Sequence, residues 1–273
     1  MSDHETLTVN SDSATDLFQA GRLDDAIAAQ IQAVKADAGN EAKRLFLFEL
    51  AVFAGQWDRA GRQLDAINYP DAERNANVAA YRALLDAEKQ RADVIASGKR
   101  PEFLIDPPAD TERRVEALHC LSQNRPEQAE AILRKLDEEA TPIRGQLNGQ
   151  PFELLRDCDD LFGSTLEVFS TTGAYYWVPI QQIASLTVNE PQQLRDLAWL
   201  PATLEMQDGP SGDVFLPVRY PNSEKHADND VRLARSTDWS EPENGPVRGS
   251  GVRLYLVDDD ASALPDWRTL IIE

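Results

Sequence analysis

The stretch RLFLFELAVFAGQWDRAGRQLDAI, residues 44–67, indicates a pair of packed helices. Apolar residues recur at helical spacing over residues 45–53 and cover most of the helix surface, which is typical of a helix buried between neighbours. Gly55 interrupts this helix, and a second helix begins near Trp57. Because such a hairpin leaves apolar surface uncovered, the stretch predicts further helices beside it.

The same turn occurs more than once along the chain. AGRLDDA at residues 20–26 matches AGQWDRA at residues 54–60, so that a Gly and an Ala recur 34 residues apart. This is the tetratricopeptide-type period, with Gly at the turn and a small Ala where two helices approach closely. A weaker third copy, LSQNRPEQA at residues 121–129, has Asn124 near the Gly position. Unrelated hairpins that share turn chemistry are the alternative, but two matches at one period favour a repeat.

The charge of the chain limits the classes of partner. With 273 residues and a net charge of −20, the chain is strongly acidic. Nucleic acid and anionic membrane surfaces would be repelled by this charge, so neither is expected as a partner. We interpret the charge as an aid to solubility rather than as an acidic binding function.

Cysteine and histidine usage indicates no cofactor. The two cysteines, Cys120 and Cys158, form no pair motif, and the three histidines are scattered along the chain. Zinc and iron–sulfur spacings are absent from the sequence, so no metal or other cofactor is expected. The polar N-terminus is unlike a secretory signal, and no run is long enough for a transmembrane helix. We therefore expect a soluble, cytoplasmic protein.

The period of the sequence changes near residue 143, which predicts an α+β fold. N-terminal tetratricopeptide-like helical hairpins precede a mixed, mainly antiparallel α+β domain. The expected division is a disordered arm at residues 1–13, a helical domain at 14–142 and a C-terminal α+β domain at 143–273. The helices expected after the central hairpin cover residues 75–97, 110–122 and 126–140.

The C-terminal part shows strand patterns. Strands are expected at residues 166–170, 175–178, 183–188, 213–219 and 252–257. Thr172 and Gly173 suit a turn that joins the first two of these strands into a hairpin. A short helical piece is expected at residues 192–199, and the last dozen residues carry no pattern that assigns them.

The C-terminal part contains an ordered set of motifs: DCDDLFGSTLE at residues 157–167, YYWVP at 175–179, LRDL at 194–197 with WLPA at 199–202, PVRYPNSE at 217–224, and TDW at 237–239. This ordered set resembles the ImpE/TagJ family, accessory proteins of bacterial type VI secretion systems. No single motif is specific, but their order is. The helical half is similar to that family as well, so that the resemblance covers residues 14 to about 255.

The chain departs from the family pattern in two places. An Arg-Leu-Gly-Pro run of the family is replaced by Leu161-Phe162-Gly163-Ser164, and an aromatic-rich Phe-Glu-Trp by Phe152-Glu153-Leu154. These changes leave the fold expectation intact and suggest a divergent branch.

The resemblance implies a non-enzymatic adaptor. Such a protein would bind the small subunit of the contractile sheath, through a helix of that subunit, and would assist the AAA+ ATPase that recycles contracted sheath. A general peptide-binding tetratricopeptide scaffold outside secretion is an alternative, because stacked hairpins form a concave face that accepts helices or extended peptides.

One acidic cluster suggests an enzymatic alternative. Asp157, Asp159 and Asp160, together with Glu153 and Glu167, could supply oxygen ligands to Mg²⁺ or Ca²⁺, and the three aspartates could serve a metal-dependent hydrolase. The opposing interpretation is a turn in which Asp side chains cap backbone N–H groups, and we favour it. No nucleophile set and no Gly-rich phosphate loop can be assembled from the remaining residues.

Aromatic and arginine residues in the C-terminal motifs are the candidates for binding a protein partner. They are Tyr176, Trp177, Arg195, Trp199, Arg219 and Tyr220. The alternative for the two tryptophans is core packing, since residues 175 and 177 of a strand face one side and residue 176 the other. For the arginines, the alternative is structural pairing, of Arg195 with Asp196 and of Arg219 with Tyr220.

Overall fold

A computed structural model describes residues 13–67, 72–240 and 244–273 of the chain. The arm expected at residues 1–13 lies outside these ranges except for Ser13, whose side chain caps the first helix. Seven helices of the described chain precede the first strand: α1 (Ala14–Gln19), α2 (Leu23–Ala36), α3 (Glu41–Phe53), α4 (Trp57–Asp65), α5 (Ala72–Ser97), α6 (Ala109–Ser122) and α7 (Pro126–Glu139). The α+β prediction is confirmed.

Three of the helix pairs share one turn. Gly21, Gly55 and Asn124 all adopt positive φ, at 74°, 66° and 55°. In each turn the residue after the Gly or Asn donates its backbone N–H to the carbonyl oxygen of the residue five positions earlier, at 2.8–2.9 Å. The Ala at the repeat position of the next helix is fully buried in all three hairpins. The match at residues 121–129 is therefore a hairpin of the same kind, with Asn taking the left-handed conformation that Gly adopts in the other two.

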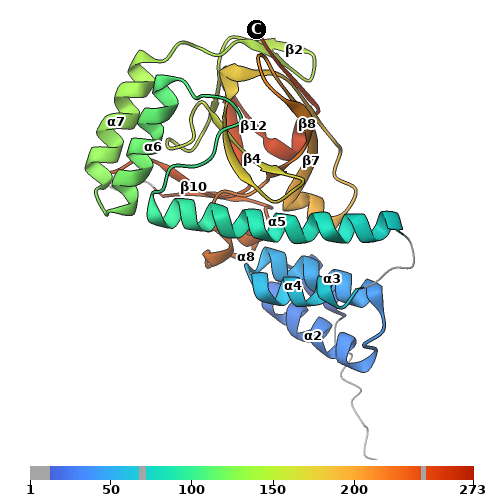
Figure 1. Ribbon diagram of the computed structural model, residues 1–273. Coiled ribbons are helices and arrows are strands. Elements are labelled where there is room, and N and C mark those ends of the chain that lie inside the picture. The colour runs from blue at the N-terminus through green and yellow to red at the C-terminus, as the bar shows by residue number, and fades with distance from the viewer. Residues whose placement is uncertain (1–12, 68–71, 241–243) are drawn as a thin grey trace, which may run out of the picture.

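Helix α5 joins the two halves of the molecule. Figure 1 shows it as a long helix that lies between the N-terminal hairpins and the β-strands. It contacts α4 on one side, and β4 (Thr165–Ser170) and β5 (Tyr175–Pro179) on the other. The side chains of Glu88 and Arg91 are both buried at this contact. A helix in such a position must be apolar on two faces or satisfy its polar groups internally.

The strands form three antiparallel sheets. The largest has eight strands in the order β2-β1-β13-β6-β7-β8-β4-β5, the second the order β12-β11-β3, and the third pairs β10 with β9. The remaining bounds are β1 (Gly145–Leu147), β2 (Gln150–Phe152), β3 (Leu155–Asp157), β6 (Ile183–Val188), β7 (Trp199–Met206), β8 (Ser211–Pro217), β9 (Thr237–Ser240), β10 (Arg248–Gly251), β11 (Leu254–Val257), β12 (Asp260–Ala263) and β13 (Thr269–Ile272). Short helices interrupt the strands: η1 (Ile180–Gln182), η2 (Leu194–Leu197), η3 (Ser223–Lys225), α8 (Asn229–Arg232) and η4 (Leu264–Asp266).

Most expected elements are confirmed, and some differ. The helical piece expected at residues 192–199 is only the single turn η2, because Trp199 already begins strand β7. Strand β7 was not predicted, because Pro201 near its start argues against a central strand. The alternation of buried and exposed residues that is typical of a strand begins only after this proline. The unassigned C-terminal residues supply β13, which lies between β1 and β6 within the large sheet. Only long-range pairing gives these last residues their place.

The hydrophobic interior comprises two clusters. One lies among the strands and includes Leu186, Leu200 and Trp267. The other joins the helices to the strands, since Phe48 of α3 packs in it with Trp199 of β7, ring centroids 6.3 Å apart.

The division expected between residues 142 and 143 stays a prediction. No helix in the described ranges combines the length and apolar character that crossing a bilayer requires.

We predict that replacing Gly55 costs more stability than replacing Gly21. Both substitutions by Ala impose left-handed strain of about 1–2 kcal/mol. A Cβ at Gly55 would also meet Cγ of Glu224 at 2.3 Å, whereas at Gly21 the nearest atom, Oδ1 of Asp230, is 3.5 Å away. Urea unfolding should therefore show a larger loss for Gly55→Ala than for Gly21→Ala.

The added Glu224→Ala substitution tests this cause. It should bring the loss from Gly55→Ala close to that from Gly21→Ala. Equal losses for the two glycine variants in the presence of Glu224 would contradict the prediction.

Candidate functional site

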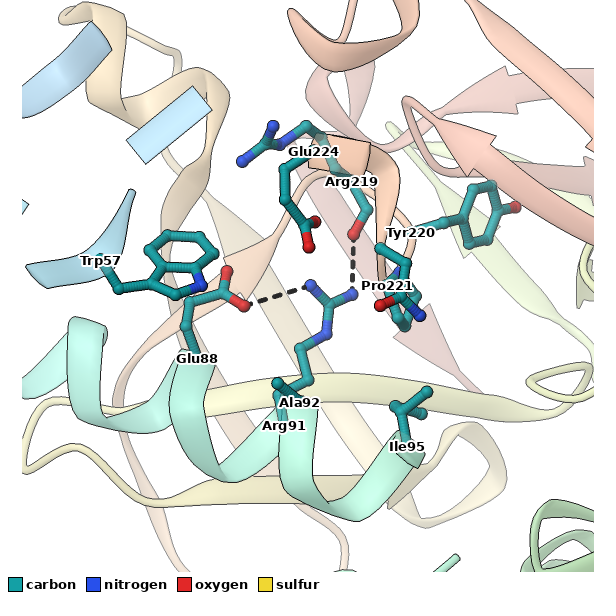
Figure 2. Close-up of a pocket in the computed structure, with 10 residues that line it drawn as sticks. Trp57, Glu88, Arg91, Ala92, Ile95, Arg219, Tyr220, Pro221 and Glu224 are labelled. Atoms are coloured by element: carbon teal, nitrogen blue, oxygen red, sulfur yellow. Dashed lines mark hydrogen bonds and ion pairs between the residues drawn. The ribbon is translucent and has the colours of Figure 1, made fainter. Parts of the chain in front are cut away.

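A small pocket lies where the N-terminal hairpins, α5 and the C-terminal strands meet (Figure 2). Trp57 stands at the start of α4, Glu88 and Arg91 project from α5, and the segment from Arg219 to Glu224 closes the opposite side. The aliphatic stem of Glu224 packs on Gly55, so the turn of the hairpin positions this wall. The full lining is Trp57, Glu88, Arg91, Ala92, Ile95, Arg219, Tyr220, Pro221, Asn222 and Glu224.

The pocket borders a buried network of arginines and carboxylates. Glu167 of β4 is bound by two guanidinium groups. Arg91 donates from Nε at 2.8 Å and from Nη2 at 2.6 Å, and Arg253 donates from Nη2. Arg253 also donates from Nη1 to Oδ2 of Asp157 at 2.5 Å. Since the side chains of Glu167, Arg253 and Asp157 have no exposed surface, this chain of charges holds α5, β3 and β4 together in a low-dielectric interior.

Aromatic side chains complete the network. Tyr175 donates its hydroxyl to Glu167 and accepts from Nε1 of Trp177 at 2.6 Å. Tyr220 donates its hydroxyl to Oδ1 of Asp157 at 2.7 Å. Trp199 donates from Nε1 to Oε1 of Glu88 at 2.9 Å. The polar atom of each ring is satisfied inside the chain, as burial of Tyr and Trp requires.

The guanidinium of Arg219 is hydrogen-bonded by backbone carbonyls. Its guanidinium donates to the carbonyl oxygens of Val52 at 3.1 Å and Phe53 at 2.9 Å, at the C-terminus of α3, and to that of Arg232 at 2.7 Å. The C-terminal end of a helix carries partial negative charge, which favours a cation there. Burial nevertheless lowers the pKa of Arg219 to about 10, so the group stays charged at neutral pH.

The network shifts the pKa values of the two buried carboxylates in opposite directions. Burial raises the pKa of Asp157 to about 6, although Arg253 opposes the change. Burial acts on Glu167 as well, but Arg91 and Arg253 together outweigh it and hold the pKa of Glu167 below its ordinary value. One carboxylate is therefore held charged, while the other accepts a proton in weakly acidic solution.

The acidic cluster at residues 157–160 is a structural turn. Asp157 accepts from the backbone N–H of Asp159, and Asp159 accepts from that of Leu161, at 2.8 and 2.9 Å. Arg248 pairs with Asp159 at 2.9 Å, and Asp160 pairs with Arg156 at 3.0 Å. No group of three potential ligands among the described side chains is arranged to hold a metal ion. The carboxylates of this turn thus bind arginines and N–H groups, which does not favour the hydrolase alternative.

Four of the six candidate partner-binding residues are buried in the chain itself. Trp177 and Trp199 pack in the cluster that joins helices and strands, as the core-packing alternative states. Arg219 and Tyr220 are 5% and 1% exposed. Arg219 pairs with carbonyls rather than with Tyr220.

The other two candidates remain partly exposed. Tyr176 lies on the opposite face of β5 from Trp177 and packs against the strand cluster. Arg195 pairs with Glu49 of α3 at 2.7 Å, and not with Asp196, which caps η2 by accepting backbone N–H groups. A role of the six residues in partner binding stays a prediction.

The first helices of the N-terminal hairpins face the C-terminal part of the chain. Glu49 of α3 binds Arg195, and Phe18 of α1 lies 5.2 Å beneath the guanidinium of Arg235. Arg235 also donates to the carbonyl oxygen of Phe18 at 2.9 Å. These side chains, which a concave tetratricopeptide face would offer to a ligand, are already engaged within the chain.

The arginines at the centre of the network were not selected from the sequence as functional residues, and Asp157 and Glu167 were considered only as possible metal ligands. Arg91 and Glu88 interrupt the apolar face of a long helix, and Glu167 and Arg253 stand inside apolar strand patterns. A charge on a face that is otherwise buried is a signal for a buried partner. The sequence contains that signal, but not which charges meet.

We predict that Arg253→Leu lowers the free energy of unfolding by about 3–5 kcal/mol, because it leaves two buried carboxylates without their shared cation. The matched control is Lys99→Met, which breaks a pair with Asp93 whose side chains are 65% and 58% exposed. This control should cost less than about 1 kcal/mol. Urea unfolding at pH 7 measures both values, and a loss below 1 kcal/mol for Arg253→Leu would contradict a network that supports the fold.

A second prediction concerns pH. The pKa of Asp157 in the folded chain, about 6, lies above its ordinary value of 3.8, so the folded state binds this proton more tightly than the unfolded state. The stabilisation is complete below the ordinary value and is lost as pH rises through 6. Wild type should therefore lose stability relative to Asp157→Asn by about 1.4 kcal/mol per pH unit between pH 4 and 6.

The comparison with Asp157→Asn cancels the other titrating groups, which are common to both proteins. Urea unfolding of the two proteins at half-unit pH steps gives the difference directly. A difference that does not change with pH would mean that Arg253 keeps Asp157 charged throughout this range.

Comparison with known proteins agrees with this architecture. The ImpE protein family matches residues 149–271. The type VI secretion system accessory component TagJ of Pseudomonas aeruginosa is 36% identical over 260 residues, which cover 95% of this chain and 91% of the relative. A crystal structure of protein VPA1032 from Vibrio parahaemolyticus superposes with a TM-score of 0.84 at 25% identity, covering 95% of this chain and 97% of that one. The chain belongs to the ImpE family.

Proposed function

We propose that the chain is a non-enzymatic accessory protein of a bacterial type VI secretion system. The observation that carries this proposal is the 36% identity to an accessory component of such a system over 95% of the chain. The relative spans both the hairpins and the strands, so the comparison concerns the whole arrangement and not one shared module.

The chemistry of the interior supports a role without catalysis. The buried carboxylates bind other groups of the chain. Glu167 accepts hydrogen bonds from two arginines, and Asp157 accepts them from Arg253 and Tyr220. Burial raises the pKa of the half-buried Cys158 to about 11, so its thiol is protonated and a poor nucleophile at neutral pH. Such groups stabilise the fold rather than move protons.

The partner that we propose is the small subunit of the contractile sheath, bound through one of its helices. By holding that subunit, the protein would assist the AAA+ ATPase that recycles contracted sheath. The resemblance of the ordered motifs to the ImpE/TagJ family motivates this choice. Helical hairpins support it, because they accept helices on their surfaces.

A pull-down of purified small sheath subunit by this protein tests the proposal. We expect capture of the full-length subunit, and loss of capture when the terminal helix that carries the epitope is removed. The control is a folded, unrelated acidic protein as bait, since net charge alone could retain the subunit. Circular dichroism shows whether the bait is folded. If folded bait fails to capture the subunit both in the presence and in the absence of the ATPase, the choice of partner is refuted.

A further inference from the structure

The outer surface of α4 and α5 around Trp57 has features that contacts within the chain do not explain. Trp57 is half-buried and lines two surface hollows in addition to the inner pocket. One hollow lies between α4 and α5 and contains Gly61, Arg62, Leu85 and Lys89. We call the residues Trp57, Arg59, Gly61, Arg62 and Lys89 the Trp57 surface.

The glycine in the middle of α4 is the first of these features. Gly61 has ordinary helical φ, and an added Cβ would meet only one described atom within 4 Å, Cδ1 of Leu85 at 3.8 Å. Packing within the described chain therefore leaves room for Ala, which is the better helix former. A glycine that internal packing does not require leaves the helix backbone open to close approach from outside.

The balance of charge is the second feature. Arg62 is exposed and forms no ion pair with a described residue, and the guanidinium of Arg59 donates to the amide of Gln56. Arg82 and Lys89 are matched by Asp65 at 2.9 Å and Asp86 at 3.2 Å. The lining of the two hollows therefore contains two arginines without a described carboxylate partner, Arg59 and Arg62, and one carboxylate without a described cationic partner, Asp58. This local excess of positive charge lies on a chain whose net charge is −20.

We propose that the Trp57 surface is the docking site for a carboxylate-bearing helix of the protein partner. The groove between α4 and α5 receives that helix over Gly61, Trp57 supplies the apolar anchor, and Arg59 and Arg62 pair with its acidic side chains. This site rests on the proposed function for the identity of the partner. It also fits the contacts of Glu49 in α3 with Arg195 and of Phe18 in α1 with Arg235, which occupy those two helices within the chain.

The test is a calorimetric titration of the full-length protein with purified small sheath subunit. Arg62→Glu should weaken the Kd about tenfold, because it places like charges across the interface. Gly61→Ala should weaken binding while raising Tm by about 2 °C, since Ala favours the helix but obstructs the approach. Arg134→Glu makes the same charge change at an exposed position of α7 and should bind as wild type does.

The outcomes separate the two proposals. If wild type binds and both Arg62→Glu and Gly61→Ala bind equally well, the docking site is wrong while the proposed function stands. If wild type does not bind the sheath subunit at all, both proposals fall. If light scattering shows a wild-type dimer that Arg62→Glu converts to a monomer, the occupant is a second copy of this chain, and the docking site for a partner helix is overturned.

Discussion

The two guanidinium groups that share Glu167 are the constraint on which the structure depends. Arg91 belongs to the helical half and Arg253 to the strand half, and both bind one carboxylate that has no exposed surface. Burying three charges is costly unless each meets its partners with good geometry. The helix α5, the strand β4 and the segment before β11 must therefore be placed together, and the relative position of hairpins and sheets follows from this requirement.

The same constraint engages conspicuous aromatic side chains inside the chain. Tyr175 and Tyr220 donate their hydroxyls to the buried carboxylates, and Trp177 donates in turn to the hydroxyl of Tyr175. Their apolar rings fill the interior while their polar atoms complete the hydrogen bonds, which is the usual solution for buried Tyr and Trp. The interior is thus committed to holding the chain together, and binding must use the surface.

Two helical hairpins project from this core, and the chain itself uses one side of them. Arg219 caps the C-terminus of α3, and Arg195 and Arg235 reach α3 and α1 from the C-terminal part. Both arginines at the hairpin faces stack on aromatic rings, of Tyr81 and Phe18 respectively. The tetratricopeptide-like hairpins are therefore attached to the sheet module through side chains of α1 and α3.

The sequence by itself determined the local structure. Apolar spacing and the Gly or Asn turns predicted the hairpins and the long helix, because helical periodicity and left-handed turns depend on residues close in the chain. The ordered motifs indicated the family. Only the tertiary structure decided where β13 enters the sheet, that Trp177 and Tyr220 face inward, and that Arg91 meets Glu167 across 76 residues. The physical reason is that strand pairing and buried ion pairs join residues distant in sequence, and a charged residue in an apolar pattern shows that it needs a partner but not which one.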